Sequence, residues 1–431
     1  MLKTKKFLSL LLAVLMLSTV LAGCVSDPAS PVSEDPSSTA SGGDETINLT
    51  FWTLMGRASA FDELTKEFEA ANPNIKITVS YYDTDPIKDA LKVAASSKSL
   101  PDMWFMWGGS LGGFYAENNL TYDLTAYADA HGWADTFSPG VMSLCTLSGK
   151  LSGYPTGYNV ISMYYRKDIF EQNGLSIPNT LEEFEQVCDA LKAKGIVPVS
   201  TAGMYGWHIM RIVEQLIEHY AGPQLHDSMN AFTESYNNEA VVKALTKYQE
   251  YCQKGYFPEG FVTADPADTK MTFYTGAAAM IPEGQWYDGV IIQDEQDISK
   301  YGVFAFPSGD KRRLSAFGEM TQFNANLTEA QVDAGVKYMN FLYSQTSLDR
   351  FGEYYSRPLP RLDAVMPDGQ PNVPVALDIS NKNGTFTITD QAFPTEIADA
   401  LFNVQDGIAN GQITPADGAA QIQAAIEAYR K

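Results

Sequence analysis

Strand-like and helix-like segments alternate through the first part of this chain. Apolar and polar residues alternate over 47–51 and again over 75–81, as in strands, and apolar residues recur at helical spacing over 59–71 between them. A second helical pattern spans 85–94, and the continuous apolar run over 103–107 is typical of a strand buried on both faces. This repetition predicts an α/β fold with a mainly parallel sheet flanked by helices.

The same alternation returns later, after a conspicuous connecting strand. Four turn residues lie within 149–157, and the run Tyr158–Tyr165 that follows has strong strand character. We interpret this run as a strand that leaves one lobe and enters another; the alternative is an ordinary hairpin strand within a single domain. Beyond it we expect strands over 196–200, 277–281, 302–306 and 317–325, and helices over 181–191, 208–220, 238–254 and 415–429.

Four of the six tryptophans lie at or just past predicted strand ends. Ligands of doubly wound sheets bind beyond the carboxyl ends of the strands. Indole rings suit the apolar faces of sugars, and nearby polar groups can replace water on the hydroxyls. For any one tryptophan a partly buried structural role is an equal alternative, but the four together predict a sugar-binding cleft. They are Trp52, Trp107, Trp207 and Trp286, and the polar candidates near them are Arg57, Asn159, Glu283 and Glu319.

The charge balance argues against two classes of partner. The chain has 52 acidic and 30 basic residues, a formal net charge of −22. Such an excess of negative charge disfavours nucleic acid and electrostatic docking on anionic lipid. We therefore expect no nucleic-acid partner.

The sequence gives little support for an enzymatic function. Residues 108–112 match G-x-S-x-G after a strand, as in a nucleophile elbow, but a tight turn explains the glycines equally well. None of the four histidines lies in a suitable late loop. No motif for metal, phosphate or dinucleotide binding accompanies a suitable element, so we expect neither a metal nor a cofactor. A glycosidase needs only two carboxylates and stays an open alternative.

The N-terminal residues are expected to lie outside the folded part. Residues 1–23 join a lysine-rich start to an apolar run, as in a secretory signal peptide. Residues 24–45 are rich in Ser, Pro and Gly and predict a disordered tether. No later run is long and apolar enough to span a membrane. Besides Cys24, we interpret the remaining cysteines as buried thiols rather than as a disulfide framework; they are Cys145, Cys188 and Cys252.

The end of the leader resembles the lipobox of bacterial lipoproteins. It reads Leu21-Ala22-Gly23-Cys24. The resemblance implies that Cys24 becomes the acylated first residue, and that the protein is held at a membrane only through this lipid.

The order of several short motifs resembles the extracellular solute-binding proteins of ABC importers, in the carbohydrate-binding group that includes maltose-binding protein. The likeness runs from Thr46 to the C-terminus. The motifs are Phe51-Trp52, the stretch 68–75 reading FEAANPNI, Leu100-Pro101-Asp102-Met103, Tyr154-Pro155, Tyr164-Tyr165-Arg166-Lys167-Asp168, the stretch 276–286 from Gly276 to Trp286, and the loop 360–365.

The resemblance implies a two-lobed fold with hinge crossings near Tyr158 and Phe317. It places 46–158 and 320–358 in one lobe, and 159–319 and 359–431 in the other. By position in the family, Trp286 and either Tyr205 or Trp207 would stack on sugar rings. Arg57, Trp107 and Asn159 also fall at ligand positions, and departures from maltose-binding protein at Arg57, Gly109 and Asn159 indicate another glycan.

The function implied is binding without catalysis. A monomer, lipid-anchored on the extracellular face of a bacterial membrane, would capture a sugar or oligosaccharide between its lobes. It would then deliver the sugar to the transmembrane subunits of an ABC permease that has a separate ATPase. The alternatives are a surface glycan-degrading lipoprotein and a binding protein for a non-sugar solute such as a polyamine, metal chelate or peptide.

Overall fold

The computed structural model describes residues 46–355, 359–365 and 368–431. The expected signal peptide 1–23, the tether 24–45 and Cys24 lie outside these residues. The first part of the chain alternates strands and helices as the sequence predicts. Its elements are β1 (Ile47–Leu54), α1 (Ala58–Ala71), β2 (Ile75–Tyr82), α2 (Thr84–Ser96), β3 (Met103–Trp107), α3 (Ser110–Glu117), α4 (Thr125–Ala130), α5 (Trp133–Thr136), α6 (Pro139–Cys145), β4 (Thr146–Leu147) and β5 (Lys150–Leu151).

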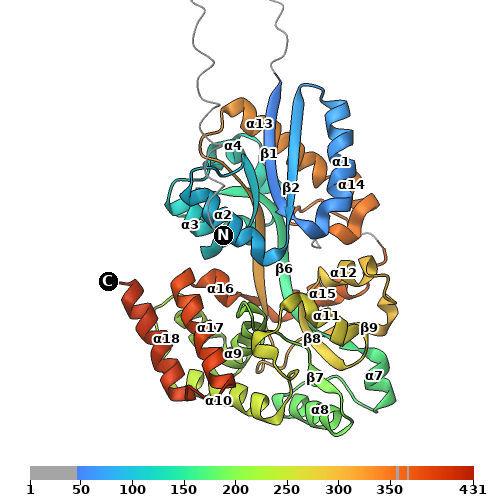
Figure 1. Ribbon diagram of the computed structural model, residues 1–431, viewed down its shortest axis with the longest axis vertical. Coiled ribbons are helices and arrows are strands. Elements are labelled where there is room, and N and C mark those ends of the chain that lie inside the picture. The colour runs from blue at the N-terminus through green and yellow to red at the C-terminus, as the bar shows by residue number, and fades with distance from the viewer. Residues whose placement is uncertain (1–45, 356–358, 366–367) are drawn as a thin grey trace, which may run out of the picture. The chain divides into compact units, whose positions relative to one another are not determined.

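The later part adds the remaining elements. They are β6 (Gly153–Arg166), α7 (Lys167–Gln172), α8 (Leu181–Ala193), β7 (Val197–Val199), α9 (Trp207–Asn230), α10 (Glu239–Lys254), α11 (Thr269–Tyr274), β8 (Ala278–Gly284), α12 (Tyr287–Gln293), β9 (Tyr301–Phe304), β10 (Leu314–Phe323), α13 (Glu329–Leu342), α14 (Gln345–Phe351), α15 (Asn372–Asn383), β11 (Thr385–Thr387), α16 (Thr389–Ala392), α17 (Thr395–Ala409) and α18 (Pro415–Tyr429). In Figure 1, α10 and α17 lie beside α18, the helix predicted over 415–429.

One mixed sheet runs through both parts, in the order β2-β1-β3-β10-β6-β8-β7, with β9 paired to β6 and β11 to β10. The strands β2, β1 and β3 are parallel, because a helix returns the chain after each of β1 and β2. The carboxyl ends of β1 and β3 therefore point to the same edge of the sheet, where the predicted ligand site lies.

Two long strands carry the chain between the two ends of this sheet. The first half of β6 pairs with β10, and its second half, from Ile161 to Arg166, pairs with β8 and β9. Likewise β10 pairs with β11 near Leu314 and with β3 from Glu319 to Phe323. Tyr158 and Gly318 lie opposite each other at the midpoint of this crossing.

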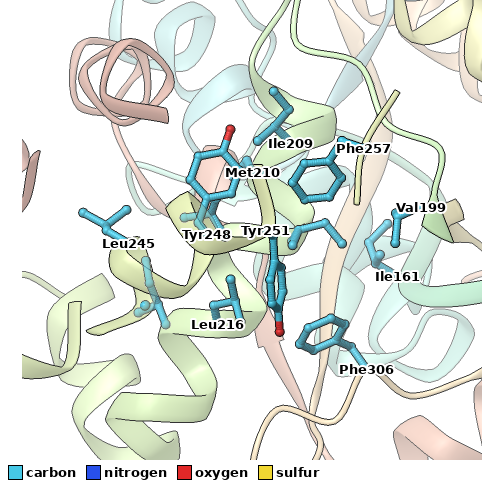
Figure 2. Packing of buried hydrophobic residues seen from close by; sticks show 14 of the residues in the cluster. Ile161, Val199, Ile209, Met210, Leu216, Leu245, Tyr248, Tyr251, Phe257 and Phe306 are labelled. Carbon is cyan, nitrogen blue, oxygen red and sulfur yellow. The ribbon is translucent and has the colours of Figure 1, made fainter. Parts of the chain in front are cut away.

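Separate hydrophobic cores lie on the two sides of the crossing. One core contains buried residues from Leu49 to Tyr154 and from Met320 to Leu359, which we call lobe 1. The others contain buried residues from Val160 to Phe317 and from Ala376 to Ile426, which we call lobe 2. Figure 2 shows part of the lobe 2 core, in which aromatic rings pack among aliphatic side chains, including Tyr248, Tyr251, Phe257, Phe306, Ile161 and Val199.

One segment differs from the expected division of the lobes. Residues 359–365 were expected in lobe 2, but Leu359 packs in the lobe 1 core, and main-chain bonds join Ser138 to Pro360 and Leu362 to Thr136. The basic cluster 311–313 is fixed to lobe 2, because Arg313 binds Glu218 and Asp227.

The cysteines within the described part of the chain are free thiols. Cys145 and Cys188 are buried and Cys252 is partly exposed. Burial raises the pKa of all three thiols, which keeps them protonated. Among the helices of the described residues, none has the length and apolar character needed to cross a membrane.

Candidate functional site

A cavity of about 510 Å³ lies between lobe 1 and lobe 2. Lobe 1 lines it with the turns that follow β1 and β2 and with the end of β3. Lobe 2 lines it with the start of α9 and the end of β8, while β10 and α16 form part of its wall. The ends of β1, β2, β3 and β8 therefore meet at the cavity, as expected for a ligand site of an α/β sheet.

The structure brings six of the eight proposed ligand-binding residues to this one cavity. Three come from lobe 1 or the crossing strand β10, and three come from lobe 2. They are Arg57, Trp107 and Glu319, and Tyr205, Trp207 and Trp286. The polar candidate Glu283 lines it too.

The other two residues, Trp52 and Asn159, do not line the cavity. Trp52 stands two residues before the end of β1 and packs on Tyr82, with ring centroids 5.0 Å apart. Because β1 continues to Leu54, its carboxyl end lies beyond Trp52. Asn159 is fully buried in β6, where its side-chain oxygen accepts a hydrogen bond from Gln285 at 3.3 Å.

A buried ion pair forms the lobe 1 wall. The Arg57 guanidinium donates to the Glu319 carboxylate at 2.8 Å and to the Tyr343 hydroxyl at 3.0 Å. It also lies over the Phe105 ring, 4.8 Å from the centroid. The side chains of Arg57 and Glu319 are each only 7% exposed, so the pair is fixed in position before any ligand arrives.

A second arginine holds the aromatic rings of lobe 2. Arg211 lies 4.6 Å from the Trp207 ring centroid and 5.4 Å from that of Trp286, and it donates to Glu283 at 2.8 Å. Burial raises the pKa of Glu283, and Arg211 partly opposes this effect. Burial and the Arg211 charge hold the pKa of the adjacent His208 well below its usual value, so the imidazole is neutral.

The lysine–aspartate pair of Lys88 and Asp85 on α2 contacts aromatic rings of both lobes. Lys88 on α2 donates to Asp85 at 2.8 Å and lies over Trp107, 4.9 Å from the ring centroid. The same ammonium is 6.0 Å from the Trp207 ring centroid, and the Trp207 indole N–H donates to Asp85 at 3.4 Å. Trp107 and Trp207, which belong to different lobes, therefore flank one lysine.

Reasoning from the sequence missed Arg211, Lys88, Asp390 and Gln391, all of which line the cavity. Arg211 lies one helical turn after Trp207, and this i, i+4 spacing could have revealed it. Asp390 and Gln391 belong to α16, about a hundred residues after Trp286. No local pattern links α16 to the site.

The charges of the cavity lining have a simple balance. Its four basic residues each bind a carboxylate at 2.8 Å: Arg57 with Glu319, Lys88 with Asp85, Arg211 with Glu283 and Lys270 with Asp294. Four further carboxylates in the lining form no salt bridge among the described residues: Asp83, Asp265, Glu353 and Asp390. The cavity is therefore net acidic.

The G-x-S-x-G segment has a structural role in the described chain. The Ser110 hydroxyl donates to the main-chain carbonyls of Asp390 and Phe393, and Gly109 has a left-handed φ of 61°. Two of the histidines are buried in lobe 2: His208 lies beside Glu283 of the cavity lining, and His226 bonds Glu218. Within the described residues no cluster of His, Cys, Asp and Glu has a metal-binding arrangement.

Comparison with known proteins defines the class. Residues 63–374 match the family of bacterial extracellular solute-binding proteins, and the chain belongs to this family. An uncharacterized ABC transporter extracellular-binding protein of Pyrococcus horikoshii is 26% identical over 303 residues, which are 67% of this chain and 68% of that protein.

Two further relatives have sugar-related names. A multiple sugar-binding protein of Streptococcus mutans is 22% identical over 312 residues, covering 71% of this chain and 70% of that protein. The solved structure of a chitin oligosaccharide binding protein superposes with a TM-score of 0.80 at 22% identity, covering 90% of this chain and all of that one. The structural likeness supports the two-lobed α/β fold.

Proposed function

We propose that this protein captures a sugar or oligosaccharide between its two lobes and delivers it to an ABC importer. The observation that carries this proposal is the convergence of Trp107, Trp207, Trp286 and Tyr205, from different lobes, on one cavity. Sugars offer apolar faces that stack on such rings and hydroxyls that bond to the carboxylates and guanidinium groups between them. The names of the relatives support a sugar ligand.

Aromatic rings on both lobes would also allow a bound ligand to favour a state in which the two lobes close over it. A ligand shifts a conformational equilibrium only by its additional affinity for one state. A sugar that touches Trp107 and Trp286 together gains contacts that one lobe alone cannot supply. Ligand binding would therefore favour the closed arrangement that a permease recognises, and the protein itself would perform no reaction.

The charges of the cavity lining argue against an anionic sugar. An anionic sugar would need a cation, but each lining cation already binds a carboxylate. It would also face the carboxylates that form no salt bridge in the described structure. We therefore propose a neutral glycan.

Thermal-shift measurements test the sugar and its charge together. We expect at least one neutral oligosaccharide among maltotriose, raffinose and chitin oligosaccharides to stabilise the protein by about 2.7 kcal/mol at a hundredfold excess over its dissociation constant. Oligogalacturonides of the same length should give no shift. A shift with oligogalacturonides alone would refute the charge assignment, and shifts with polyamines or metal chelates alone would refute the sugar.

A second candidate, an amine-binding protein, is favoured by one specific observation. Asp83, Asp265, Glu353 and Asp390 give the cavity an excess of carboxylates, which a protonated amine could neutralise. The polyamine arm of the same panel separates this candidate from the neutral glycan. A reducing-sugar assay over the oligosaccharides tests the remaining alternative, a glycan-degrading lipoprotein, for which we expect no product.

We further propose that Cys24 carries a lipid that holds the protein on the extracellular face of the membrane. Replacing Cys24 by serine should move the mature protein from the membrane fraction to the medium, because the acylated thiol is lost. Cell fractionation and immunoblotting measure this directly. Cys252→Ser is the matched control and should stay with the membranes; a membrane-bound Cys24→Ser variant would contradict the proposal.

A further inference from the structure

The short helix α16 lies where both lobes and the crossing strands meet. From lobe 1, the Ser110 hydroxyl donates to the carbonyl oxygen of Asp390 at 3.0 Å and to that of Phe393. A side chain at Gly109 would collide with the Gln391 carbonyl, so the turn after β3 and α16 are in direct contact. This lobe 2 helix is thus docked on lobe 1.

The Gln391 side chain joins the same helix to the crossing strand β10. Its carbonyl oxygen accepts a hydrogen bond from the Gly318 N–H, and its amide donates to the Gly318 carbonyl, both at 3.3 Å. Gly318 pairs with Tyr158 at the midpoint of the crossing. Because Asp390 and Gln391 also line the cavity, α16 touches the ligand site and the crossing together.

One buried carboxylate fixes the start of this helix. Glu214 on α9 is fully buried, and its Oε2 accepts hydrogen bonds from the Thr389 N–H and the Thr389 hydroxyl, both at 2.9 Å. A four-residue helix has little stability of its own, so its placement depends on such external contacts.

The surroundings of Glu214 place its titration in the physiological range. Burial raises the pKa of Glu214 to about 7, and the nearby Asp390 raises it further, while Ser315 on β10 and the Thr389 groups lower it. Tyr236, which follows α9, faces the same group, and burial together with Glu214 raises the pKa of that phenol. None of these neighbours is a cation.

We propose that Glu214 is a positioning residue for the ligand cavity: its carboxyl group holds α16, and with it Asp390 and Gln391, against lobe 1. The consequence for sugar affinity rests on the proposed function, whereas the anchoring of α16 does not. Because burial raises the pKa of Glu214 above that of an exposed carboxyl group, an opening of α16 that admits water to Glu214 releases a proton. The docked position of α16 is therefore favoured as the pH falls through 7 and weakened as the pH rises.

Hydrogen–deuterium exchange of the full ligand-free chain tests this proposal. We expect the protection factor of residues 388–394, corrected for intrinsic exchange at each pH, to rise about tenfold from pH 8 to pH 6, because the docked state binds a proton with a pKa near 7 that an exposed carboxyl group releases. Glu214→Gln, which keeps the shape and cannot ionise, should show the same protection at both pH values.

Asp390→Asn provides the control, because burial also raises the pKa of Asp390. This variant should keep the rise in protection toward low pH, with its midpoint moved to lower pH because the Asp390 charge raises the pKa of Glu214. Protection that is constant or falls in the wild type from pH 8 to pH 6, or that varies in Glu214→Gln as it does in the wild type, overturns the proposal. The wild-type profile decides the matter even if Glu214→Gln does not fold. The exchange experiment uses the ligand-free protein. Its result can therefore be interpreted even if no sugar in the thermal-shift panel binds.

Discussion

Replacing Arg57 by methionine is expected to lower the free energy of unfolding by about 3–5 kcal/mol, because it removes one partner of a buried ion pair. The Arg57 and Glu319 side chains are 7% exposed and their charged atoms are 2.8 Å apart. The variant would leave the Glu319 carboxylate buried without its guanidinium and would remove the donor to the Tyr343 hydroxyl. Urea denaturation followed by circular dichroism measures the loss.

A matched surface pair provides the control. Arg350 binds Glu63 and Glu67 at 2.6 and 2.8 Å, but its side chain is 38% exposed and those of its partners more so. Arg350→Met should therefore cost much less stability than Arg57→Met. Because the distances resemble those of the buried pair, equal losses in the two variants would show that burial is not what makes Arg57 important. A double variant, Arg57→Met with Glu319→Leu, should recover part of the loss.

The periodicity of the sequence was sufficient to predict most of the fold. Alternation predicted β1 and β2, the continuous apolar run predicted β3, and helical spacing predicted α18 with its observed bounds, Pro415–Tyr429. These are local patterns whose outcome depends on which face of each element is buried. The predicted strands also gave the positions of their carboxyl ends. The sequence alone could therefore place Trp107, Trp207 and Trp286 at one predicted site.

The rest of the site depends on pairings between distant segments. Asp390 reaches the cavity because α16 docks on Ser110 and Gly318, and neither contact has a signature near residue 390. Asn159 was placed at the ligand by its position in the family, but the strand pairing turns its side chain toward Gln285. A tight turn was one of two explanations of the G-x-S-x-G pattern; it holds at Gly109, whereas Gly112 lies within α3. The Ser110 hydroxyl joins the lobes, a use that no motif predicts.

Replacing Trp286 by alanine is expected to weaken binding of the oligosaccharide that gives the largest thermal shift by about 2 kcal/mol, roughly thirtyfold in Kd. The indole is partly exposed to the cavity and is held between Arg211 and the Phe317 ring, whose centroid lies 5.4 Å away. It is therefore a rigid surface for a sugar face, and its removal should change the stability of the free protein much less than its affinity. Isothermal titration calorimetry measures the change in Kd.

A variant at Gly284 tests whether the position of the Trp286 ring matters, because it displaces the ring without removing it. An alanine at Gly284 would put a methyl group into the space of the Trp286 ring, so the ring must move while remaining in the chain. Gly284→Ala should therefore weaken binding nearly as much as Trp286→Ala. Gly56→Ala is the matched control, because Gly56 also lines the cavity and a methyl group there meets no atom within 4 Å. Unchanged affinity in both Trp286→Ala and Gly284→Ala would exclude Trp286 from the ligand site, since its removal and its displacement would then have the same null effect.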